Sequence, residues 1–122
     1  MLNQPSPTDL DRIAELGRAL GHPKRLAILD MLMQGVQCNC EIAAQLGLAD
    51  NLISHHMRVL QDVGLVTSER DPVDARWIYY AIDAPAVDAA VADLGRFLDT
   101  GRLQPRSPGC GPAGGGQGRC CS

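Results

Sequence analysis

Aromatic residues are scarce in this chain of 122 residues, which has one tryptophan, two tyrosines and one phenylalanine. The length fits one domain, so its core must be built mainly from Leu, Ile, Val and Ala. A small aliphatic core of this kind is only marginally stable on its own. Burial of a shared face between two copies would add to the stability, and we therefore predict a homodimer.

Long hydrophobic runs are also missing. No stretch reaches the roughly 18 apolar residues of a membrane span, and the N-terminus lacks the basic and apolar regions of a signal peptide. We therefore expect a cytoplasmic protein with no membrane partner. Thiols stay reduced in that compartment, so the five cysteines are expected to be ligands or redox switches rather than structural disulfides.

The sequence has no excess of basic residues, since its net charge is −3 and its pI is near 5.4. Net charge is an average over the surface, so DNA binding depends on where the basic side chains lie. We predict a modest, strongly salt-sensitive affinity for DNA, carried by Lys24, Arg25, Arg58, Arg70 and Arg76. An enzyme is not expected, because neither a phosphate-binding Gly loop nor a nucleophile and base at useful spacing is present.

Caps and apolar periodicity predict four helices in the first half of the chain: one starting at Ser6-Pro7-Thr8-Asp9, then residues 24–34, 39–46 and 50–63. The second helix is apolar nearly all round, which predicts a central, buried position. Gly47 closes the third helix just before the fourth begins. Two short helices joined by a tight Gly turn are typical of a helix-turn-helix.

Residues 65–70 and 76–82 are rich in β-forming residues and flank a turn, which predicts a hairpin, or wing. A last helix over residues 85–99 carries a narrow apolar seam suited to a partner helix. The predicted fold is thus mainly α with a small β-hairpin wing, dimerising through the first and last helices. Its parts are a flexible N-terminus (1–5), a winged helix-turn-helix domain (6–99) and a flexible Gly/Pro/Cys-rich tail (100–122).

The chain resembles the ArsR/SmtB family of winged-helix metal-sensing repressors over about residues 8–99. Three stretches carry the resemblance: residues 22–29 (HPKRLAIL), residues 51–60 (NLISHHMRVL), and Gly64-Leu65-Val66 leading into the strand at 76–80. The resemblance implies a homodimer that occupies an operator when metal-free and leaves it when an ion binds. Cys38-Asn39-Cys40 looks like the Cys-x-Cys of members that sense arsenic, antimony, cadmium or lead.

Two thiols can close on one soft ion, and trivalent arsenic or antimony prefers two or three thiolates. In a regular helix Cys38 and Cys40 would point about 200° apart, so we expect binding to distort the first turn of the third helix. A site at a helix N-terminus also favours the thiolate form. A third ligand would come from the tail, which offers Cys110, Cys120 and Cys121.

On the fourth helix, the polar face predicts base-edge contacts by Asn51, Ser54 and His55, and a phosphate contact by Arg58. His56 precedes an apolar residue and is expected to pack inward. Arg70 and Arg76 flank the wing turn, and they are predicted to contact phosphate or the minor groove.

These observations predict a repressor that binds double-stranded operator DNA as a dimer and is released by As(III) or Sb(III), without an organic cofactor. Two alternatives remain open. One is a thiol-redox or a cadmium-, lead- or zinc-responsive repressor of the same fold. The other is an interaction or metal-buffering module that does not bind DNA.

Overall fold

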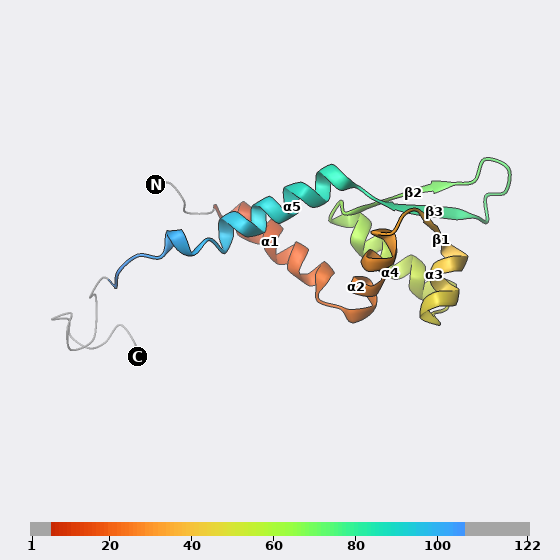
Figure 1. Cartoon of the computed structure of the whole chain (residues 1–122), viewed down its shortest axis with the longest axis horizontal. Helices are drawn as coiled ribbons and strands as arrows, with labels where there is room; N and C mark the ends of the chain where they lie inside the picture. Colours follow the sequence, from red (N-terminus) through yellow and green to blue (C-terminus); the bar gives the residue numbers. More distant parts are fainter. Residues whose placement is uncertain (1–5, 107–122) are drawn as a thin grey trace.

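The computed structural model describes residues 6–106, which form five α-helices, a three-stranded sheet and a short 3-10 helix (Figure 1). In chain order they are α1 (Pro7–Leu20), α2 (Pro23–Leu32), β1 (Gln37–Cys38), α3 (Asn39–Leu46), α4 (Asp50–Asp62), β2 (Val66–Arg70), β3 (Ile78–Ile82), α5 (Ala84–Phe97) and η1 (Thr100–Arg102). The predicted winged helix-turn-helix is confirmed. No helix within the described residues is long and apolar enough to cross a membrane.

The helix-turn-helix consists of α3 and α4, which begin at the predicted residues. Gly47 ends α3 in the left-handed conformation, with φ of +64°, which a residue with a Cβ adopts only at a cost. On α4, the apolar residues Ile53, Met57 and Leu60 are fully buried. This face fixes the orientation of the helix, so the opposite face points to solvent.

Helix α2 departs from the prediction in two ways. It ends at Leu32, two residues earlier than expected, and it is not buried all round, because Leu26 is 50% exposed while Ile28 is fully buried. Residues two apart point to nearly opposite sides of a helix. Since α2 contacts α1, α3, α4 and β3 with its other faces, Leu26 is left on the uncovered one.

The sheet contains one strand more than the sequence predicts. Strands β2 and β3 form the expected hairpin, with Val66 opposite Ile82 and Arg70 opposite Ile78. The additional strand β1 pairs antiparallel with β3, placing Gln37 opposite Tyr80 and Cys38 opposite Tyr79, so the strand order is β1-β3-β2. Two residues are too few to give an alternating pattern, which is why the sequence does not predict β1.

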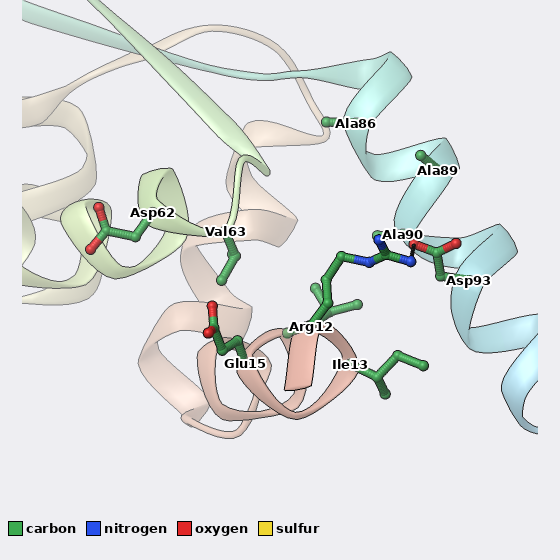
Figure 2. Close-up of a pocket in the computed structure, with 10 residues that line it drawn as sticks. Arg12, Ile13, Glu15, Asp62, Val63, Ala86, Ala89, Ala90 and Asp93 are labelled. Atoms are coloured by element: carbon green, nitrogen blue, oxygen red, sulfur yellow. Dashed lines mark ion pairs between the residues drawn. The ribbon is translucent and has the colours of Figure 1, made fainter. Parts of the chain in front are cut away.

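Helices α1 and α5 lie side by side at the end of the domain opposite the wing loop (Figure 1). An ion pair of 3.3 Å joins Arg12 of α1 to Asp93 of α5 beside a cavity of about 340 Å³, which α1, α5 and the end of α4 line (Figure 2). The predicted seam of α5 divides: Val87 and Leu94 pack against the core, whereas Val91 and Leu98 are 63% and 69% exposed.

The predicted domain limits stay predictions. Residues 100–106, assigned to the tail, include η1, which Asp99 caps. Residues 1–5 and 107–122 lie outside the described residues, and with them Cys110, Cys120 and Cys121.

Candidate thiol site and nucleic-acid interface

The two thiols of the Cys-x-Cys pair meet directly. Cys38 ends β1 and forms the N-cap of α3 with extended backbone angles (φ −87°, ψ 161°), while Cys40 lies in the first helical turn. Their sulfurs are 2.8 Å apart. The expectation that the helix must distort to bring them together was therefore wrong, because Cys38 precedes the helix and the 100° step per residue does not apply to it.

The environments of the two thiols differ. Cys38 is 3% exposed and Cys40 is exposed. Burial, together with the contact from Cys40, raises the pKa of Cys38 to about 11. The expected preference for thiolate at this helix terminus is therefore wrong for Cys38, because the loss of hydration outweighs the helix dipole.

Neighbouring groups hold the backbone of the pair. The Glu41 carboxylate accepts a hydrogen bond of 2.7 Å from the Cys38 N–H, and this bond lowers the pKa of Glu41. The amide oxygen of Asn39 accepts one of 3.3 Å from the Ile78 N–H, on β3. Between residues 6 and 106, no group of three or more Cys, His, Asp or Glu side chains is arranged to hold a metal ion. The described site thus offers two sulfur ligands.

The polar face of α4 is exposed to solvent. All four residues predicted to contact DNA are exposed, namely Asn51, Ser54, His55 and Arg58. The wing arginines are exposed too, but each already has a partner within the loop. Arg70 Nη1 donates 2.7 Å to the Ala75 carbonyl, and Arg76 pairs with Asp74 at 2.8 Å.

His56 is buried, as expected, and lies beside Arg25 of α2. Arg25 Nη1 is 3.3 Å from His56 Nδ1, and the rings of His22 and His56 are 4.7 Å apart. Burial, then the charges of His22 and Arg25, lower the pKa of His56. A neutral imidazole is thus favoured against the arginine.

Arg25 is the residue whose role sequence reasoning missed. Its Nε and Nη2 donate to the carbonyls of Ala19 (2.7 Å) and Arg18 (3.1 Å), at the end of α1. It therefore faces inward and is not an exposed charge for DNA. No local sequence pattern predicts this arrangement, because it depends on how α1, α2 and α4 pack together.

Comparisons with known proteins place this geometry in a family. Residues 22–68 match the family described as bacterial regulatory protein, arsR family. The HTH-type transcriptional regulator YgaV of Escherichia coli is 38% identical over 85 residues, which cover 69% of this chain and 83% of YgaV. The chain belongs to the ArsR family. The matched segment runs from the start of α2 to β2, so it contains both Cys38 and the whole of α4.

Other ArsR-family relatives agree. The HTH-type transcriptional repressor SmtB of Mycobacterium tuberculosis is 39% identical over 67 residues, which cover 54% of this chain and 50% of SmtB. The crystal structure of NolR from Sinorhizobium fredii has 30% identity and a TM-score of 0.59, covering 78% of this chain and 96% of that one. The protein is accordingly a member of a family of DNA-binding transcriptional regulators rather than enzymes.

Proposed function

We propose that this ArsR-family repressor binds operator DNA as a homodimer and leaves it when trivalent arsenic or antimony binds the thiols of Cys38 and Cys40. The observation that carries the proposal is the 2.8 Å separation of the two sulfurs at the start of α3, the helix that a short turn joins to α4. Soft ions select thiolate ligands.

The pair fits a soft ion with a small adjustment. Sulfurs held tetrahedrally at about 2.3 Å from an ion, as in zinc thiolates, lie roughly 3.8 Å apart. The exposed Cys40 side chain can take up part of this change by rotating outward, and its exposure gives the ion access from solvent. Trivalent arsenic tolerates an open coordination side, so two thiols make a usable site. Cys110, Cys120 or Cys121 of the tail would supply a third.

Helix α4 is the element proposed to enter the major groove. Its solvent face presents Asn51, Ser54 and His55 for base edges and Arg58 for phosphate. The wing arginines, Arg70 and Arg76, would reach the backbone beside it. In a dimer the two copies of α4 would read half-sites about one DNA turn apart.

The apolar surface on α1 and α5 supports the dimer. Val91 of α5, Leu98 just after it and Leu10 of α1 are 63%, 69% and 43% exposed. The two helices that carry these residues lie side by side (Figure 1). Covering this surface with a second copy removes apolar area from water, which favours association.

The test is fluorescence anisotropy of labelled upstream DNA with the reduced protein, followed by separate titrations of arsenite, antimonite, cadmium, lead, zinc and peroxide. We expect release by arsenite or antimonite. Cys38→Ser with Cys40→Ser should leave DNA binding intact and abolish release, whereas Cys110→Ser/Cys120→Ser/Cys121→Ser tests the third ligand. Release that persists in the Cys38/Cys40 variant would refute this site, and release by cadmium, lead or zinc alone would reassign the ion.

The same short distance favours one alternative, a thiol-redox repressor. Peroxide would take two electrons and two protons from the pair, giving a Cys38–Cys40 disulfide and two molecules of water. Release by peroxide, with none by arsenite under reducing conditions, would establish this function. No DNA binding at low salt would remove both repressor mechanisms and leave an interaction or metal-buffering module.

A further inference from the structure

The thiol pair has a second physical connection to the DNA-binding surface, besides the turn from α3 to α4. Cys38 belongs to β1, and its partner across the sheet is Tyr79 of β3. Strand β3 is also one arm of the wing (residues 66–82), since it pairs along its whole length with β2. A displacement of Cys38 can therefore be passed to the wing through the pairing of β1 with β3.

Asn39 extends this connection beyond the end of β1. It lies between the two cysteines, at the first position of α3, where the strand has stopped. Its side-chain oxygen accepts a hydrogen bond of 3.3 Å from the N–H of Ile78, the first residue of β3. The amide side chain thus replaces the next backbone acceptor of the β1–β3 ladder and ties the thiol site to the base of the wing loop.

We expect occupancy of the pair to disturb the contact between Asn39 and Ile78, because only one of the two sulfurs, that of Cys40, is free to rotate. The sulfurs are 2.8 Å apart, and two tetrahedral ligands of a soft ion stand roughly 3.8 Å apart. The Cys38 side chain is 3% exposed and packed, so it cannot take up the whole change by rotation. Part of the displacement then falls on the backbone of residues 38–40, and Asn39 is at its centre.

We propose that Asn39 is a positioning residue that transmits occupancy of the Cys38–Cys40 pair to the wing. This inference rests on the proposed function, in which the pair controls DNA release. The wing carries Arg70 and Arg76 on either side of its loop. A shift at Ile78 alters the loop that holds these arginines, because the Trp77 carbonyl accepts a hydrogen bond of 2.9 Å from the Asp71 N–H across the loop.

Trp77 makes the wing directly observable. It is the only tryptophan in the chain, it immediately precedes Ile78, and it is 43% exposed. Its emission therefore reports the wing without DNA. We would titrate arsenite into the full-length wild type, Asn39→Ala, Asn39→Asp and the control Gln45→Ala, an exposed position later in α3. Protection of thiols against a thiol reagent measures occupancy in each variant, and DNA anisotropy measures release.

We expect arsenite to change Trp77 emission in the wild type, in Asn39→Asp, which keeps an oxygen acceptor, and in Gln45→Ala. In Asn39→Ala the thiols should still be protected and free protein should still bind DNA, but the emission change should be lost. One net hydrogen bond corresponds to roughly two- to twelvefold in an equilibrium constant, so the ratio of DNA affinities without and with arsenite should fall by that factor.

An emission change that persists in Asn39→Ala would overturn the inference, and so would an unresponsive Trp77 in a wild type that releases DNA. The latter result would leave the proposed function standing. If arsenite does not bind the wild type, the proposed function fails on its own. The coupling would then be tested in a variant with Cys110→Ser, Cys120→Ser and Cys121→Ser. In this variant diamide would oxidise Cys38 and Cys40 to a disulfide, taking up the two electrons and two protons that the thiols lose. If Asn39 couples the pair to the wing, disulfide formation should change Trp77 emission in that chain but not in its Asn39→Ala variant. The same emission change in both would refute the coupling.

Discussion

Replacing Arg25 by methionine tests the inward role of this side chain. Its guanidinium donates to the carbonyls of Ala19 and Arg18, which end α1, and lies 3.3 Å from the ring of His56 on α4. The last carbonyls of a helix have no N–H partner four residues on; Arg25 bonds that of Ala19 and adds a second donor to that of Arg18, which also accepts from the Gly21 N–H at 3.3 Å. Methionine keeps most of the apolar stem and removes every one of these contacts.

The expected loss follows from the contacts. A hydrogen bond from a charged donor contributes about 1.5–3 kcal/mol. Arg25 is only half-buried, so the two carbonyl bonds are taken near the lower end of that range. We expect Arg25→Met to lower the free energy of unfolding by about 2–4 kcal/mol. Arg25→Lys should recover only part of this loss, because one ammonium group cannot reproduce the fork that reaches both carbonyls.

Urea unfolding at one fixed protein concentration measures the effect, because unfolding of a dimer depends on concentration. Lys24→Met is the matched control: it removes a neighbouring exposed charge and should change stability by less than about 0.5 kcal/mol. The salt dependence of DNA binding should be unaltered by Arg25→Met, since this arginine does not face phosphate. Equal stabilities of Arg25→Met and Lys24→Met would refute the reasoning.

Three further predictions concern other elements. Burial and the charges of His22 and Arg25 lower the pKa of His56, so near this pKa the unfolded chain binds a proton that the folded chain does not. The free energy of unfolding should therefore fall as the pH drops below about 6.5, by at most about 1.4 kcal/mol per pH unit. When the free energy of unfolding is measured with urea between pH 7.5 and 5.5, it should depend less on pH in His56→Asn than in the wild type. An identical pH dependence would contradict this prediction. Gly47→Ala forces a Cβ into φ +64° and should cost about 1–2 kcal/mol, more than Gly47→Asn, by thermal unfolding. Val91→Asp places a charge on the uncovered α5 face and should shift sedimentation toward monomer, whereas an unchanged dimer would exclude this face.

Elements with strong local signals could be predicted from the sequence. The capping box of Ser6 and Asp9 marks the start of α1, and Gly47 marks the end of α3. The exposure of the polar face of α4 also follows from sequence, because Ile53 and its apolar companions recur at helical spacing. In each case the residues that determine the structure lie within a few positions of one another.

The remaining features depend on contacts between distant segments. The β1–β3 pairing joins Cys38 to Tyr79, and without it the N-cap position of Cys38, its burial and its raised pKa cannot be inferred. The partly buried contact between Arg25 and His56 likewise joins residues of two helices that are 31 positions apart in the sequence. A composition-based estimate counts Arg25 as a surface charge, whereas tertiary packing turns it toward α1.

The pairing of β1 with β3 also bears on the order in which the protein is assembled. All of α3 and α4 lies within the chain segment that this pairing closes, between residues 38 and 79. During synthesis the residues of α4 leave the ribosome well before Tyr79 and Tyr80, and domains are made from the N-terminus. A nascent chain therefore contains the residues of α4 before the strand that fixes Cys38 has been made. Closing a loop of this length is an entropic cost that β3 must offset late in folding, so the thiol pair reaches its final geometry only after the residues of α4 have been made.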